Sequence, residues 1–198
     1  MSVAGLLLAA GAGRRIGGPK ALLQLDGRTF VERGVTLLRD AGCDPVLVVL
    51  GARAEDVCPF VVADVVVAVD WQEGVGASLR AGLSALASRT AAACVVALVD
   101  QPLISVEAVR RLLAVAGKAD AAVATYGGEP GHPVLLDRLA WDDVVAQAIG
   151  DVGARAWLRA HPARVLSVPC DGLGSAADVD TPDDLVRLRT GVPNEPRR

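Results

Sequence analysis

The opening of the chain places the strongest constraint on its fold. Residues 3–8 form a short aliphatic run that stops at a glycine-rich segment, as a strand buried on both faces of a parallel sheet does. That segment carries four glycines and three cations, at Gly11, Gly13, Gly17, Gly18, Arg14, Arg15 and Lys20. Glycines let backbone N–H groups approach a ligand and form a concavity that binds anions. The pattern predicts a strand that ends in a polyphosphate-binding loop.

Two well-known glycine motifs do not fit this loop. The dinucleotide fingerprint G-x-G-x-x-G needs its last glycine one residue earlier than Gly17, and it expects an acidic residue after the second strand. The second apolar run, residues 45–50, is followed by Gly51-Ala52-Arg53 instead. The P-loop needs Ser or Thr directly after its lysine, whereas Ala21 follows Lys20. A nicotinamide-dependent oxidoreductase therefore stays an alternative that these residues disfavour.

Composition is typical of a single domain without a nucleic-acid or membrane partner. The chain has 198 residues and a net charge of −3, and its aromatic content is 3%, which argues against nucleic-acid binding. Its apolar runs fall short of the roughly 20 residues that cross a bilayer, and its four cysteines lack C-x-x-C spacing. We expect a cytoplasmic protein whose domain spans residues 1–189, with a flexible tail over residues 190–198.

Aliphatic runs alternate with helical patterns along the chain. The predicted strands are residues 3–8, 46–50, 65–69, 94–98, 121–125, 134–136 and 165–168. The predicted helices are residues 30–41, 77–87, 106–116, an uncertain one within 139–149, then 154–160 and 182–188. Such alternation is typical of βαβ units. We therefore expect an α/β fold: one Rossmann-like domain with a mostly parallel sheet and helices on both faces.

Spacing within the loop gives a family resemblance. The segment Leu8-Ala9-Ala10-Gly11-x3-Arg15-Ile16-Gly17-x2-Lys20 resembles the signature of the nucleotidyltransferases of molybdenum cofactor biosynthesis. Its Leu-Ala-Ala-Gly is similar to the cytidylyltransferase branch, whereas guanylyltransferases usually have Leu-Ala-Gly-Gly. Further matches follow in order at residues 73–82, Val99-Asp100-Gln101-Pro102, Gly131-His132-Pro133-Val134, residues 150–155 and residues 178–182. The resemblance spans residues 3 to about 188.

The resemblance implies a fold of the nucleotide-diphospho-sugar transferase type and a magnesium-dependent reaction. CMP would pass from CTP to the terminal phosphate of molybdenum-bearing molybdopterin, with release of pyrophosphate. The implied partners are CTP (or GTP), a molybdopterin-type phosphorylated acceptor and a recipient molybdoenzyme. The open alternatives are guanylyl or other nucleotidyl transfer to the same or another phosphorylated acceptor, and a carrier or chaperone of the cofactor.

The resemblance also implies roles for individual residues. The catalytic residues are Arg15, Lys20 and Asp100, and Asp100 also holds Mg²⁺. The nucleotide-binding residues are Leu8, Ala9, Ala10, Gly11, Gly13, Arg14, Arg15, Lys20 and Ser78. The substrate-side candidates are His132, Arg155 and Asp180.

Each polar candidate also has a purely structural interpretation. Asp100 could cap a turn, and Ser78, where a loop enters a helix, could cap that helix. Asp180 belongs to Asp180-Thr181-Pro182-Asp183, which is a good helix start in any protein. His132 could be a buried structural histidine, and Arg155 could cover a helix start.

Overall fold

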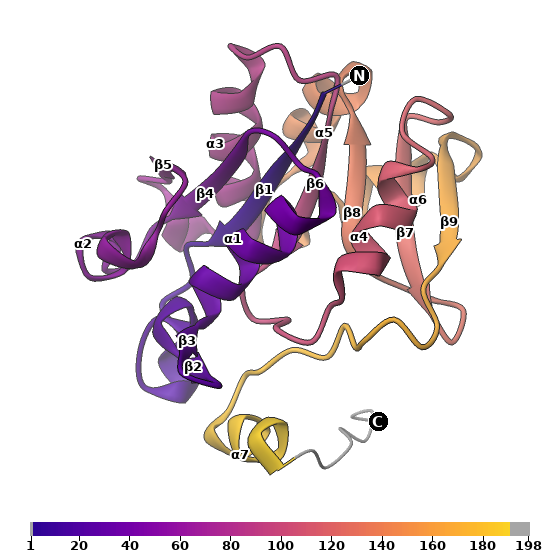
Figure 1. Cartoon of the computed structure of the whole chain (residues 1–198). Coiled ribbons are helices and arrows are strands. Elements are labelled where there is room, and N and C mark those ends of the chain that lie inside the picture. The colour runs from indigo at the N-terminus through magenta and orange to yellow at the C-terminus, as the bar shows by residue number, and fades with distance from the viewer. Residues whose placement is uncertain (1, 191–198) are drawn as a thin grey trace.

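A seven-stranded sheet organises the computed structural model, which describes residues 2–190 (Figure 1). Its strands are β1 (Val3–Ala9), β4 (Val46–Leu50), β5 (Asp64–Val67), β6 (Ala93–Leu98), β7 (Ala121–Tyr126), β8 (Glu129–Asp137) and β9 (Val165–Pro169). Their order is β5-β4-β1-β6-β8-β7-β9, and every strand but β8 runs in the same direction. The predicted mostly parallel α/β sheet is confirmed.

Helices cover both faces of this sheet, as predicted. On one face lie α1 (Phe30–Ala41) and α4 (Val106–Leu113), and on the other lie α3 (Val75–Ala87), α5 (Trp141–Gln147) and α6 (Arg155–Ala160). Strand β1 is buried along its whole length, with Leu7 and Ala9 in the α1 core and Leu6 and Leu8 in the α3 core. An uninterrupted aliphatic run therefore suits β1, because both of its faces are covered.

The structure moves some boundaries and adds short elements that the sequence did not predict. Helix α3 begins at Val75, two residues before the predicted start, and α4 ends at Leu113 instead of residue 116. Strand β8 begins at Glu129, because a Gly127-Gly128 turn with positive φ at both residues joins it to β7. The additions are α2 (Ala54–Val57) and the hairpin of β2 (Gln24–Leu25) and β3 (Arg28–Thr29).

The C-terminal segment returns across the sheet and ends in α7 (Pro182–Thr190), beside the β2–β3 hairpin (Figure 1). Of the predicted tail, Thr190 ends this helix, and residues 191–198 lie outside the described part of the chain. Within residues 2–190, no helix is long and apolar enough to cross a membrane.

Strand register brings two loops together at one edge of the sheet. Leu8 of β1 pairs with Leu98 of β6, so the segments that follow these two strands start side by side. The returning C-terminal segment joins them there, because the Val179 N–H donates to the carbonyl oxygen of Asp100 at 2.9 Å. In parallel sheets, ligands bind at this carboxyl edge.

Candidate active site

A cavity of about 700 Å³ opens at the carboxyl edge of β1 and β6. Its wall contains all but one of the predicted site residues: Leu8, Ala10, Gly11, Gly13, Arg14, Arg15, Lys20, Ser78, Asp100, His132, Arg155 and Asp180. Ala9 is the exception, since its side chain is buried in the α1 core on the other face of the sheet. The structure thus gathers residues that are distant in sequence around one space.

Gly13 fixes the shape of the predicted phosphate loop. Its φ is 58°, and a Cβ there would lie 1.9 Å from the carbonyl oxygen of Gly18. That close approach closes the loop on itself, because the Gly13 carbonyl accepts from the N–H groups of Ile16 at 3.0 Å and Gly18 at 3.2 Å. Between these residues a short 3₁₀ turn, η1 (Arg14–Ile16), presents the arginines, and the Arg15 side chain is 73% exposed. The loop therefore offers cationic groups from a tightly turned backbone.

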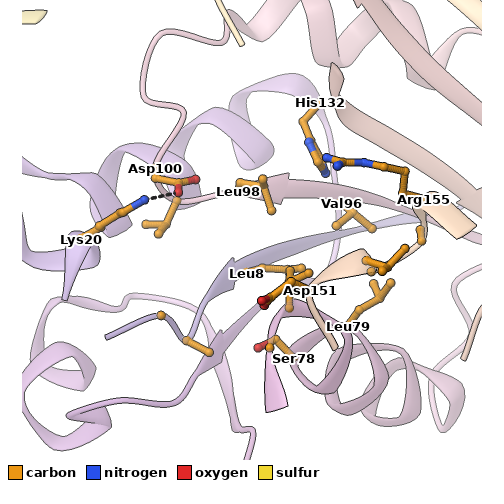
Figure 2. A pocket seen from close by; sticks show the side chains of 18 of the residues that line it. Leu8, Lys20, Ser78, Leu79, Val96, Leu98, Asp100, His132, Asp151 and Arg155 are labelled. Carbon is orange, nitrogen blue, oxygen red and sulfur yellow. Dashed lines mark hydrogen bonds and ion pairs between the residues drawn. The ribbon is translucent and has the colours of Figure 1, made fainter. Parts of the chain in front are cut away.

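Lys20 lies between two carboxylates. Its Nζ donates to Asp100 Oδ2 at 2.6 Å and to Asp180 Oδ1 at 2.5 Å (Figure 2 shows the contact with Asp100). Burial acts to lower the pKa of Lys20, but the charges and hydrogen bonds of Asp100 and Asp180 outweigh it, so the pKa is raised. Arg15 adds a weaker contact, with Nη1 3.6 Å from Asp180 Oδ2. These four residues form one charge cluster at the mouth of the loop.

Thr181 and Asp184 make reciprocal hydrogen bonds at the helix start that follows Asp180. Thr181 Oγ1 accepts from the Asp184 N–H at 3.3 Å, and Asp184 Oδ2 accepts from the Thr181 N–H at 2.9 Å. Thr181 and Asp184 thus satisfy the first turn of α7 reciprocally. The Asp180 carboxylate contacts Lys20 Nζ, so its side chain belongs to the charge cluster as well as lying at this helix start.

Gln101 holds the segment that delivers Asp180. Its Nε2 donates to the Ala176 carbonyl at 2.9 Å and to Asp178 Oδ1 at 2.8 Å. Burial raises the pKa of Asp178, and the charges of Asp100 and Asp180 raise it further, against the hydrogen bond from Gln101 and the charge of Lys20. A third carboxylate therefore stands close behind the two that Lys20 contacts.

His132 and Arg155 lie together at the opposite end of the cavity (Figure 2). Burial lowers the pKa of His132 to about 4, with the nearby Arg155 charge adding to the effect and Asp100 opposing it. His132 is therefore a neutral imidazole at pH 7. Its backbone carbonyl accepts from the Tyr126 hydroxyl at 3.1 Å, which ties β8 to β7 at this point.

Ser78 is buried in the first turns of α3 and does not cap that helix. The N-cap is Gly74, and Ser78 is only 4% exposed. Gly74 has φ 113°, and a Cβ there would lie 2.4 Å from Asp151 Oδ1. The glycine thus lets the carboxylate of Asp151 lie against the start of α3 and form part of the wall (Figure 2).

Sequence reasoning missed several residues of the wall. Asp151 stands in one of the matched motifs, and that position was the available signal. Other missed residues give the cavity an aromatic and aliphatic lining: Trp71, Leu79, Val96, Leu98, Val123, Val134 and Leu158. In the sequence, these strand and helix residues look the same as core residues.

Asp100 and Asp180 are the residues that fit a divalent cation. Both carboxylates already contact the Lys20 Nζ atom, and carboxylate oxygens are the ligands that Mg²⁺ and Mn²⁺ prefer. Within residues 2–190, no group of three or more His, Cys, Asp or Glu side chains is arranged to hold a metal ion. Two carboxylates suit an ion whose remaining ligands are phosphate oxygens and water, as is usual for Mg²⁺.

Comparison with known proteins gives the family. The profile of the MobA-like NTP transferase domain matches residues 5–165. The chain is 40% identical over 197 residues to the nicotine blue oxidoreductase of Paenarthrobacter nicotinovorans, covering 94% of this chain and 96% of that protein. It is 38% identical over 114 residues to a probable molybdenum cofactor guanylyltransferase of Opitutus terrae, which covers 52% of this chain and 50% of that protein.

Solved structures agree with this match. The crystal structure of Rv0371c from Mycobacterium tuberculosis H37Rv superposes with a TM-score of 0.85 at 32% identity, covering 96% of this chain and 98% of that one. The same protein was also solved as a complex with manganese, which superposes with a TM-score of 0.80 at 31% identity, covering 97% of this chain and 100% of that one. With most of its length matched by the family profile, the chain belongs to the family of MobA-like NTP transferase domains.

Proposed function

We propose that this protein transfers CMP from CTP to the terminal phosphate of a molybdopterin-type acceptor and releases pyrophosphate. The observation that carries the proposal is the charge cluster of Arg15, Lys20, Asp100 and Asp180 at one end of a cavity whose other end holds His132 and Arg155. One end suits a triphosphate, and the other offers a separate place for a second, phosphorylated substrate.

In the proposed reaction, an acceptor phosphate oxygen bonds to the α-phosphorus while the bond to the leaving pyrophosphate breaks. The attacking oxygen is already anionic near neutral pH, so catalysis consists of positioning and charge neutralisation. Arg15 and the glycine N–H groups hold the β- and γ-phosphates, and Lys20 donates near the α-phosphate. Arg155 holds the acceptor phosphate, while neutral His132 offers it a hydrogen bond without adding charge.

Asp100 and Asp180 would hold the divalent cation, with Mg²⁺ as the proposed ion. When bound, it neutralises phosphate charge that the cationic side chains leave. The manganese complex of the mycobacterial relative supports a requirement for a divalent cation. We propose Mg²⁺ because hard oxygen ligands of this kind usually hold it beside substrate phosphates.

The choice of CTP rests on Ala10 and Ser78. Ala10 stands where the guanylyl branch usually has glycine, and the Ser78 hydroxyl lies in the wall where a base would be contacted. Guanylyl transfer is the competing specificity, and the Opitutus relative favours it. The deciding assay gives the purified protein each of the four triphosphates with molybdenum cofactor and Mg²⁺ and follows pyrophosphate. Faster release with CTP supports the proposal, and release only with GTP overturns the cytidylyl assignment.

A second candidate function is oxidoreduction. The similarity to nicotine blue oxidoreductase favours it, because the match extends over nearly the whole of both chains. Against it, β4 is followed by Gly51, Ala52 and Arg53, with no acidic residue directly at its end. The next acidic residues are Glu55 and Asp56, and Asp56 is paired with Arg53 Nε at 2.5 Å. Its test is spectrophotometric: the protein is mixed with a reduced nicotinamide cofactor and nicotine blue, and oxidation of the nicotinamide is followed. Turnover there, together with no pyrophosphate release, would select this candidate.

A further inference from the structure

The Lys20 ammonium occupies the position between Asp100 and Asp180 that a metal ion would take. Its Nζ contacts one oxygen of Asp100 and one of Asp180, at 2.6 Å and 2.5 Å. Two oxygens that both contact one nitrogen can both contact one metal ion at the same position. A partly buried ammonium and a divalent cation a few ångströms apart repel each other where solvent screening is reduced. The Lys20 ammonium and a metal ion therefore compete for the carboxylates of Asp100 and Asp180.

The carboxylates need a cation at all times. Asp100 and Asp180 are only 22% and 32% exposed, and the third carboxylate, Asp178, lies close behind them. A cluster of like charges in partial burial is costly unless a counter-charge accompanies it. Lys20 fills that need, and its flexible side chain lets the ammonium move while the backbone stays in place.

A displaced ammonium has few places to go within the cavity. Among the described residues of the wall, the remaining carboxylate is Asp151, which lies at the base of α3 away from Lys20 (Figure 2). Asp178 already accepts from Gln101. The phosphates of a nucleotide held on the loop of Gly11 and Gly13 are thus the counter-charge within reach of Lys20.

We propose that Lys20 and the divalent cation occupy the position between Asp100 and Asp180 in turn, so that arrival of the metal ion releases Lys20 to the nucleotide phosphates. This inference rests on the proposed nucleotide site. The exchange makes metal binding and triphosphate binding depend on each other. The metal ion alone would leave the Lys20 ammonium without a counter-charge, and the triphosphate alone would meet a Lys20 that is still paired with Asp100 and Asp180. The affinity of the protein for the metal ion is therefore higher when the triphosphate is bound, and its affinity for the triphosphate is higher when the metal ion is bound.

The chain offers a direct test because it contains two lysines, Lys20 and Lys118. Protein labelled with ¹³C at the lysine ε-carbon gives one signal for each, and Lys118 serves as the internal control. With Mg²⁺ alone, the Lys20 signal is expected to shift at millimolar concentrations. With a non-hydrolysable CTP analogue present, the same shift is expected at concentrations at least about tenfold lower. A Lys20 signal that never moves with Mg²⁺ would overturn the proposal.

Metal affinity provides the second arm. Lys20→Met removes the ammonium and keeps most of the side-chain volume, so the variant is expected to bind Mn²⁺ about tenfold more tightly without nucleotide, as measured by calorimetry. That factor corresponds to about 1.4 kcal/mol. Arg15→Met removes a charge that lies near Asp180 but not between the carboxylates, and its expected gain is less than threefold. Lys118→Met is expected to change nothing.

The outcomes separate this inference from the proposed reaction. The proposed exchange would be overturned if Lys20→Met bound Mn²⁺ no more tightly than the wild type does. It would also be overturned if Arg15→Met gained as much Mn²⁺ affinity as Lys20→Met. Neither measurement requires turnover, so failure of CMP transfer would leave both results standing. If Lys20→Met does not fold, the labelled wild-type protein still decides the question.

Discussion

The two ends of the cavity are built differently. The phosphate end consists of an irregular loop and an irregular C-terminal segment, joined by ion pairs of Lys20 with Asp100 and Asp180. The acceptor end consists of regular elements, with His132 on β8, Arg155 at the start of α6 and aliphatic side chains from β6 and β7. One end is held by charge and the other by packing.

That difference separates two functions of the site. In the proposed reaction, the charge of the triphosphate must be neutralised whatever the acceptor is, so we expect the phosphate end to determine whether the reaction occurs. We expect the shape and polarity of the acceptor end to determine which acceptor is used. Substitutions at the phosphate end should therefore lower kcat, and those at the acceptor end should mainly raise KM for the acceptor.

The largest effect is expected for Asp100→Ala. The variant loses the proposed metal ligand and the charge that holds Lys20, so turnover should fall at least about 10³-fold, with Lys20→Ala losing roughly 10²–10³-fold. Pyrophosphate release under saturating substrates measures both. Asp26→Ala, an exposed aspartate of the β2–β3 turn, is the matched control. Near-normal turnover in folded Asp100→Ala and Lys20→Ala would refute the proposed mechanism and favour a carrier function.

At the acceptor end, the partly buried His132 should make stability depend on pH. Its folded pKa of about 4 lies below the unfolded value near 6.5. The unfolded state therefore binds more protons between these values, and the free energy of unfolding decreases as pH falls from 6.5 to 4. The full loss is up to about 3 kcal/mol. His132→Gln should lose correspondingly less stability between pH 7 and pH 4.5 in urea denaturation. Equal losses in both proteins would show that His132 titrates normally.

Asp180→Asn tests whether the phosphate end really includes the C-terminal segment. The amide cannot neutralise Lys20 or hold a metal ion strongly, so turnover should fall about 10²-fold, while the capping pair of Thr181 and Asp184 keeps α7 in place. Thr181→Ala is the complementary variant. It should cost about 1 kcal/mol of stability by loss of the cap and leave the carboxylates near Lys20 intact. An Asp180→Asn enzyme that is fully active but less stable would support the purely structural interpretation of Asp180.

Arg155→Ala should separate the two ends kinetically. Loss of a charged hydrogen bond to the acceptor phosphate costs about 1.5–3 kcal/mol, so kcat/KM for the acceptor should fall roughly 10–100-fold. The KM for CTP should hardly change, because the triphosphate is held at the other end. Initial rates with each substrate varied in turn provide the measurement. A larger effect on CTP than on the acceptor would contradict the assignment of the two ends.

The ability to predict the site from sequence also differs between its ends. Hydrophobic pattern predicts β1 and β6, and the edge rule for parallel sheets then brings Lys20 and Asp100 together. Gly13 was recognisable because a tight turn needs a residue that tolerates positive φ. Much of the phosphate end can thus be predicted from local sequence, since the glycines and charged residues of its loop are recognisable there.

Contacts between distant segments could not be predicted in the same way. The ion pair of Lys20 and Asp180 depends on an irregular segment whose course is fixed by the hydrogen bonds of Val179 and Gln101. No periodicity marks such a path. At the acceptor end, Val96 and Val123 line the cavity, whereas Val95, the neighbour of Val96 on β6, lies in the core of the opposite face. Which strand residues line a cavity depends on helix placement, and the sequence carries no separate signal for it.

The smallest expected effect is on the preference for CTP over GTP, and it concerns Ala10. Ala10 is almost fully buried in the wall, and removing its methyl group enlarges the space for a purine. Ala10→Gly should shift the ratio of kcat/KM for CTP over GTP by about tenfold toward GTP, or about 1.4 kcal/mol. Ala12→Gly is the matched control, because Ala12 lines the phosphate loop and phosphates are common to both nucleotides. Equal shifts in both variants would mean that loop flexibility, not the Ala10 methyl group, selects the base, and a wild-type preference for GTP above tenfold would end the cytidylyl assignment.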